Sequence, residues 1–142
     1  MPLSNDQDIA EVLQTIDTIG LLGASHKPER PSYQVMQFLL SHGFKVLPVN
    51  PGLSGTEILG QRVYASLAEI PCPIDMVDVF RNASYLPKIV DELISLGVEN
   101  LWTQLSVIDI DAALHAENHG IRVVMDRCPA IEIPRLQSAG LL

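Results

Sequence analysis

The chain has 142 residues, of which 47% are hydrophobic and 18% are charged, so its length and composition predict one globular domain and exclude extended disorder. It has no run of about 18 apolar residues, the length that a membrane-spanning helix needs. Asp6 and Asp8 stand where a secretory signal peptide would have basic and then apolar residues. We therefore expect a cytoplasmic protein with no membrane partner. A net charge of -8 opposes binding to nucleic acid, and two cysteines are too few for a disulfide framework or a four-thiolate zinc site.

Short β-branched runs alternate with amphipathic segments along the chain, a pattern typical of βαβ units in a parallel sheet. A helix is predicted first, over about residues 5–16, with Ser4 and Gln7 as its capping box. The remaining elements are predicted in the order strand 18–24, helix 32–42, strand 45–49, strand 74–80, helix 84–96, strand 100–103, helix 110–118 and strand 121–125. The fold class is therefore α/β, a doubly wound parallel five-stranded sheet with helices on both faces.

Two segments fit this pattern less well. Pro48 lies inside strand 45–49, which we expect to be central in the sheet, and proline donates no ladder hydrogen bond. Regular pairing is therefore predicted to end at Leu47. The segment 51–73 is too long for a simple connection and has no clear period, so a small hairpin or helical turn is predicted there.

Polar residues follow all five predicted strands, at the sheet edge where ligands of doubly wound folds bind. Four of the nine basic residues of this acidic chain fall in these loops, namely Lys27, Arg30, Arg81 and Arg127. We therefore expect a basic carboxyl edge that suits a polyanionic ligand.

The turn after the first strand has the residue types of a phosphate site. Gly23 permits close approach of the backbone, Ser25 supplies a hydroxyl, His26 is a candidate donor, and the following helix offers free N–H groups at its positive end. The same residues also fit a tight turn followed by a capping serine, and the turn alone does not decide between the two interpretations.

The dinucleotide-binding fingerprint requires G-x-G-x-x-G and an acidic residue after the second strand. Only Gly20 and Gly23 are present, and Asn50 and Pro51 stand where the acid is needed. These residues disfavour NAD without excluding it.

Three further side chains near the carboxyl edge have alternative interpretations. Cys128 stands beside Arg127, where a cation favours the reactive thiolate, but it also fits a small buried apolar residue. Asp78 is expected to accept hydrogen bonds from loop N–H groups. Trp102 is expected in the core, although it could also form the wall of a pocket.

No histidine pair has metal-ligand spacing, so no metal site is predicted.

Five stretches between residues 18 and 132 carry a family resemblance, and they read IGLLGASHKPERPSYQV, HGFKVLPVNPGLSGTEILGQRVYASLAEIP, IDMVDVFRNA, LWTQLSV and VVMDRCPAIE. Together they resemble the CoA-binding domain family of small bacterial proteins, related to the N-terminal CoA-binding domain of the succinyl-CoA synthetase alpha subunit. Two positions depart from the family pattern: Ser106 stands where glycine is usual, and Thr103 replaces an apolar residue.

The resemblance implies a Rossmann-like fold that binds coenzyme A or an acyl-CoA. The residues that it implicates are Gly23, Ala24 and Ser25 around the diphosphate, Lys27 and Arg30 on the phosphates, Asn50 and Pro51 beside the adenosine, Phe80, Arg81 and Gln104 along the pantetheine arm, and Cys128, which aligns with a family cysteine. The synthetase's phosphorylated histidine and nucleotide-binding subunit lie outside this domain.

These observations favour a non-catalytic CoA or acyl-CoA binding protein that acts as a carrier, sensor or adaptor. One alternative is an enzyme or redox-regulated protein that uses Cys128 in CoA-thiol chemistry. A second is a nicotinamide-dependent oxidoreductase, and a third is a docking module whose ligand pocket is vestigial. Homo-oligomerisation and protein partners stay open at this point.

Overall fold

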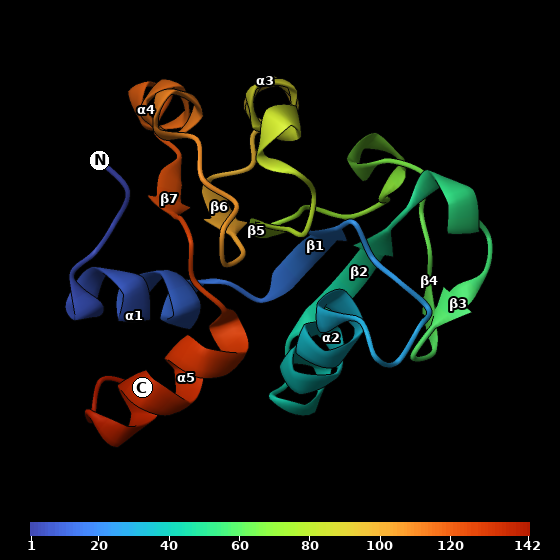
Figure 1. The fold of residues 1–142 in the computed structure, drawn as a ribbon, viewed down its shortest axis with the longest axis horizontal. Coiled ribbons are helices and arrows are strands. Elements are labelled where there is room, and N and C mark those ends of the chain that lie inside the picture. Colours follow the sequence, from blue (N-terminus) through green and yellow to red (C-terminus); the bar gives the residue numbers. More distant parts are fainter.

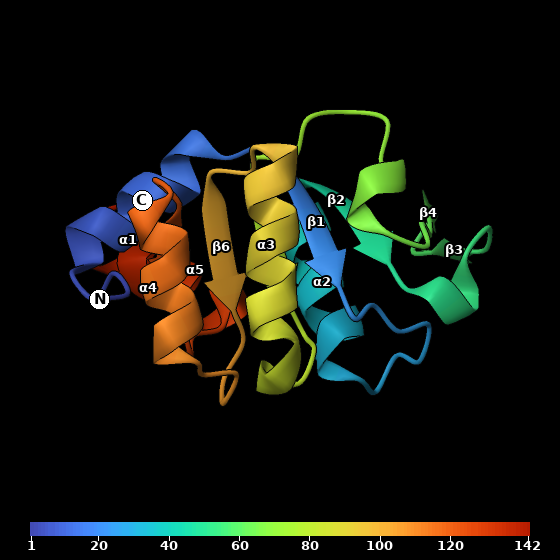
Figure 2. The same cartoon turned by 90° about the horizontal axis from the view of Figure 1, so that it is seen from above.

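Five parallel strands lie side by side in the order β2-β1-β5-β6-β7 in the computed structural model, which describes residues 1–142 (Figure 1). The strands are β1 (Thr18–Leu22), β2 (Lys45–Val49), β5 (Met76–Val79), β6 (Asn100–Thr103) and β7 (Arg122–Val124). All four strand pairs are parallel, which confirms the predicted α/β sheet. Their carboxyl ends face the viewer in Figure 1 and point downward in Figure 2.

Helices cover both faces of this sheet, as predicted (Figure 2). One face carries α1 (Asp6–Thr15), α2 (Pro31–Ser41) and α5 (Pro129–Ser138), and the other carries α3 (Leu86–Leu96) and α4 (Ile110–Asn118). A separate apolar cluster fills each side, and Trp102 is fully buried in the first, as expected of a core residue.

The predicted position of the second strand was wrong. β2 is an edge strand, and it pairs with β1 along its whole length to Val49 instead of stopping at Leu47. The carbonyl oxygen of Pro48 accepts a hydrogen bond from the N–H of Tyr64, on the side away from β1. In a strand, the N–H and the C=O of one residue point to the same side. The N–H that Pro48 lacks would therefore also face the outer side, so its absence removes no hydrogen bond to β1.

The long segment after β2 forms the predicted hairpin and helical turns. Its elements are η1 (Pro51–Leu53), the antiparallel pair β3 (Glu57–Ile58) and β4 (Gln61–Arg62), and η2 (Leu67–Glu69). A bridge between Val49 and Tyr64 joins this segment to the open side of β2.

Three local predictions need correction. The side chain of Asn5, not Ser4, caps α1 by accepting from the N–H of Gln7 at 2.8 Å. The short helix η3 (Ala83–Tyr85) precedes α3, where one continuous helix was predicted. Helix α5 was not predicted, and it contains Pro134, a residue that usually ends or kinks a helix.

Helix α5 is held by contacts with residues far away in sequence. Arg135 forms two hydrogen bonds of 2.8 Å to the carboxylate of Asp6 in α1. The carboxylate of Glu132 lies between Arg135 and Arg127. Burial acts to raise the pKa of Glu132, but the hydrogen bonds from the two arginines outweigh it and hold that pKa below its usual range.

Candidate functional site

From β1 the chain adds β2 on one side, and it then crosses over to add β5, β6 and β7 on the other side. The boundary between β1 and β5 is therefore the topological switch point of the sheet. Gly23 follows β1 there with a φ of 85°, a conformation that residues with a Cβ rarely adopt. A Cβ on Gly23 would stand 2.9 Å from the carbonyl oxygen of Phe80, which follows β5. Glycine is therefore required both by the turn and by the closeness of the two backbones.

A polar cleft of about 500 Å³ opens beside this contact. Its lining comes from the β1–α2 loop, the start of α2, the end of β2 and the end of β5, and comprises Gly23, Ser25, His26, Lys27, Arg30, Pro31, Ser32, Asn50, Gly52, Leu53 and Phe80. The N–H groups of Ser25, His26 and Ser32 have no hydrogen-bond partner within the protein. The cleft thus combines free backbone donors with the positive end of α2, which is the chemistry of an anion site.

Asn50 holds two walls of the cleft in place. Its Nδ2 donates to the carbonyl oxygen of Ala24 at 2.8 Å, and its Oδ1 accepts from the N–H of Gly52 at 2.9 Å. The carbonyl oxygen of Val49 accepts from the N–H groups of Gly23 and Ala24. These contacts use one N–H and the carbonyl oxygen of the Asn50 amide to fix the ends of β1 and β2 relative to each other.

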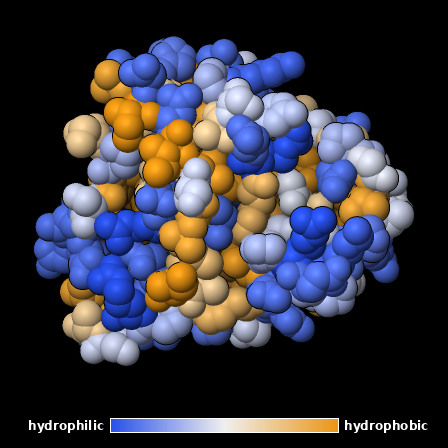
Figure 3. Space-filling model, viewed as in Figure 1, coloured by the Kyte–Doolittle hydropathy of each residue, from blue (hydrophilic) through white to orange (hydrophobic).

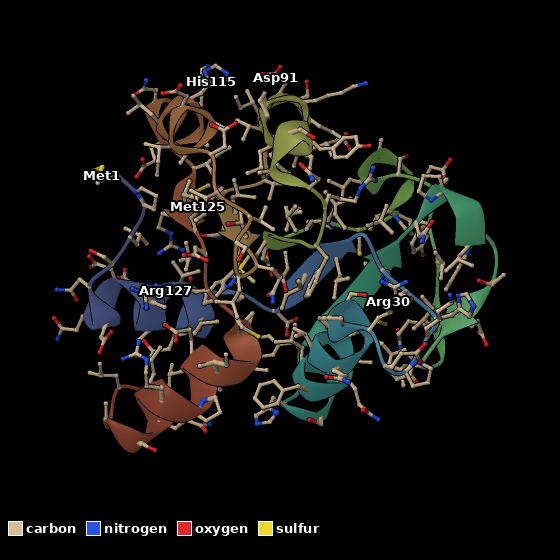
Figure 4. The ribbon with its side chains drawn as sticks, viewed as in Figure 1. Met1, Arg30, Asp91, His115, Met125 and Arg127 are labelled. Carbon is tan, nitrogen blue, oxygen red and sulfur yellow. The ribbon has the colours of Figure 1, made fainter.

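The four basic residues predicted at the carboxyl edge have different environments. Lys27 and Arg30 are exposed at the cleft and form no ion pair, whereas the guanidinium of Arg81 stacks 4.2 Å from the ring centre of Tyr85. Arg127 is paired with Glu132 of α5 at 2.6 Å and lies towards the β7 edge of the sheet, whereas Arg30 lies beside α2 towards the β2 edge (Figure 4). The positive charge available to a ligand is therefore concentrated at the β1–α2 loop.

A second, smaller pocket of about 150 Å³ lies on the α3 side of the strand ends. Pro51 and Arg81 line it together with Tyr85 and Lys88, and Leu22, Val49 and Ile89 are among its apolar residues. Pro51 and Arg81 thus belong to this second pocket, while most of the other predicted contact residues line the polar cleft.

Three predicted site residues lie below the surface. Ala24 and Cys128 are buried in the apolar cluster under α2 and α5, and only 8% of Cys128 is exposed. Gln104 is 7% exposed, and its Oε1 is buried without a hydrogen-bond partner. None of the three lines the polar cleft.

The expectation for Asp78 was wrong, because its carboxylate accepts no hydrogen bond. Asp78 is fully buried between Leu21 of β1 and Trp102 of β6, and burial raises the pKa of this carboxyl well above its usual range. Asp75, immediately before β5, instead accepts hydrogen bonds of 2.9 Å from the N–H groups of Asp17 and Thr18.

The two departures from the family pattern lie at the end of β6, where Thr103 is its last residue, and in the following loop, which contains Ser106. Ser106 adopts a φ of 70°, the conformation that glycine favours, and its N–H donates to Oδ1 of Asp126 at 2.7 Å. The hydroxyl of Thr103 donates to the carbonyl oxygen of Val107 and accepts from the N–H of Asp126. Both residues therefore fix the shape of this loop.

Several lining residues were not identified from the sequence. Ser32 was considered only as a helix cap, Leu53 lies in a stretch of the family resemblance but was given no role, and Lys88 lies outside those stretches. The bridge from Tyr64 to β2, which brings Ser66 to the second pocket, has no signal in the sequence.

No group of three or more His, Cys, Asp or Glu side chains is arranged to hold a metal ion. No helix has the length and apolar character needed to cross a membrane.

The fold and cleft together define a Rossmann-like α/β domain with a polar cleft at its topological switch point. The sequence profile of the CoA binding domain family matches residues 17–134. The chain belongs to this family, which confirms the resemblance.

Two comparisons cover nearly the whole chain. The protein YneT of Bacillus subtilis (strain 168) is 34% identical over 121 residues, which are 85% of this chain and 88% of YneT. A solved structure of a protein from Pyrococcus horikoshii OT3 has a TM-score of 0.89 and 37% identity, and the match covers 96% of each chain.

The domain also resembles part of a larger enzyme. The alpha subunit of an ADP-forming acetate–CoA ligase from Pyrococcus furiosus is 28% identical over 128 residues. This match covers 80% of the present chain but only 28% of the ligase subunit.

Proposed function

We propose that this protein binds CoA or an acyl-CoA at the carboxyl edge of its sheet, as a non-catalytic carrier, sensor or adaptor. The observation that carries the proposal is the polar cleft at the switch point, where Lys27 and Arg30 stand free of ion pairs beside unpaired backbone N–H groups. In a chain with a net charge of -8, such a local concentration of donors suits a polyphosphate.

The two pockets divide the ligand between them. The diphosphate lies in the polar cleft beside Gly23 and Ser25, with the basic side chains of Lys27 and Arg30 on the phosphates. The adenine ring lies in the second pocket, between Pro51 and the apolar side chains of its lining. The pantetheine arm then runs from β1 past Phe80 towards the ends of β6 and β7.

Thermal unfolding with CoA, dephospho-CoA, NAD and NADP in parallel tests this proposal. At 100 times the dissociation constant, a ligand specific for the folded state adds about 2.7 kcal/mol to the free energy of unfolding. We expect a midpoint increase of several degrees with CoA, a smaller one with dephospho-CoA and none with NAD. No increase with CoA, or a larger one with NAD, would overturn the proposal.

A further inference from the structure

Exposed apolar side chains gather at one place on the carboxyl edge. Five of the nine exposed large hydrophobic residues come from the β6–α4 loop, α4 and the start of α5. These five residues, here called the apolar stripe, are Leu105, Ile108, Ile110, Leu114 and Ile131, each between 48% and 54% exposed. Figure 3 shows hydrophobic atoms running from α4 across this loop towards α5, beside the hydrophilic surface around the β1–α2 loop.

The apolar stripe is a defined surface, because its two halves are tied together. The N–H of Ser106 donates to Asp126, and the N–H of Arg127 donates to the carbonyl oxygen of Thr103. These bonds hold the loop that carries Leu105 against the connection that leads to Ile131. Contiguous exposed apolar surface of this kind marks a binding site more often than isolated apolar residues do.

The stripe lies where the sulfur of a bound CoA would arrive, and this step rests on the proposed function. From β1 to β7 the sheet order gives three strand spacings, or about 14 Å. The pantetheine arm is about as long as four extended residues, which is also roughly 14 Å. With the diphosphate at Gly23, the sulfur therefore reaches the ends of β6 and β7, from which the segments that carry Leu105 and Ile131 continue.

We propose that the apolar stripe binds the hydrocarbon chain of an acyl-CoA, so that the ligand of this protein carries a medium or long acyl chain. A chain attached to the sulfur continues from the CoA site directly onto the stripe. Free CoA or acetyl-CoA would leave these side chains exposed to water, whereas a longer chain removes apolar surface on both partners from water.

Titration calorimetry with CoA, acetyl-CoA, octanoyl-CoA and lauroyl-CoA, each below its micelle concentration, tests this inference. We expect the affinity for octanoyl-CoA to exceed that for acetyl-CoA by at least about tenfold, because each buried methylene group contributes to binding. The double variant Leu105→Ser, Ile131→Ser should lose this chain-length dependence and keep the affinity for CoA. Leu96→Ser, at the exposed end of α3 on the opposite edge of the sheet, is the matched control and should change neither.

The outcomes separate this inference from the proposed function. If no CoA species binds, the proposed function fails. If CoA, acetyl-CoA and octanoyl-CoA bind with equal affinity, only the assignment of the acyl chain is overturned. If the stripe instead joins two copies of the chain, sedimentation will show a dimer that the double variant abolishes without any effect of chain length, and this result also overturns the assignment.

Discussion

Gly23 and Phe80 approach so closely that a Cβ on residue 23 would stand 2.9 Å from the carbonyl oxygen of residue 80. The contact joins the ends of β1 and β5 at the switch point, and the polar cleft opens beside it. Since Gly23 also needs a φ of 85°, two separate requirements exclude a side chain at this position.

Replacing Gly23 by alanine should therefore destabilise the protein more than the same change at Gly43. Gly43 has a φ of 88°, but a Cβ there would meet nothing within 4 Å. We expect Gly43→Ala to cost about 1 to 2 kcal/mol from its backbone conformation alone. Gly23→Ala should cost about 1 to 3 kcal/mol more because it also forces the backbones apart. Equal losses in denaturant unfolding would show that the close approach is not required.

Arg30→Ala should weaken binding of CoA by about tenfold or more, because a charge-assisted hydrogen bond to a phosphate is lost. If Arg30 contacts the 3′-phosphate, the affinity for dephospho-CoA should change much less. Arg62→Ala removes an exposed arginine of β4 outside both pockets and serves as the control. Equal effects of the two substitutions in calorimetry would contradict a specific contact and indicate only a general effect of charge.

Asp78 should make the free energy of unfolding depend on pH. Burial raises the pKa of this carboxyl in the folded protein, so the folded state binds more protons than the unfolded state above about pH 4. Stability contributed by protonated Asp78 is present below the unfolded pKa and is lost as pH rises towards the raised folded value. The Asp78→Asn variant should not show this loss. As pH rises, the free energy of unfolding of the variant should therefore increase relative to that of wild type, by up to about 1.4 kcal/mol per pH unit.

Denaturant unfolding between pH 4 and 8 measures this difference, with the exposed Asp8→Asn as the control. Parallel curves for Asp78→Asn and wild type would mean that Asp78 titrates normally.

Cys128→Ser should leave the affinity for CoA within about threefold of wild type, because the thiol is buried in the apolar cluster and does not line the cleft. The substitution should lower the free energy of unfolding by about 1 to 3 kcal/mol, since it places a hydroxyl among apolar side chains.

Mass spectrometry after incubation with CoA disulfide tests whether Cys128 forms a mixed disulfide with CoA. A CoA adduct on wild type that is absent from Cys128→Ser would support the redox alternative.

The amino-acid sequence by itself determined the α/β class, the alternation of strands and helices and the family. Apolar periodicity, caps and turn residues are local signals, and parallel strands necessarily collect the loops after β1, β2 and β5 at one edge. For this reason the grouping of Gly23, Lys27, Arg30 and Asn50 on one cleft follows from their order in the chain.

Only the tertiary structure decided which strand lies at the edge of the sheet and which polar side chains lack an ion-pair or hydrogen-bond partner. Pro48 is accommodated because β2 is an edge strand paired with Tyr64, Arg127 is neutralised by Glu132, and Asp78 is buried without a partner. These properties depend on contacts between residues far apart in sequence, and periodicity carries no information about such contacts. The apolar stripe has the same origin, because only the fold ties the loop that carries Leu105 to the connection that leads to Ile131.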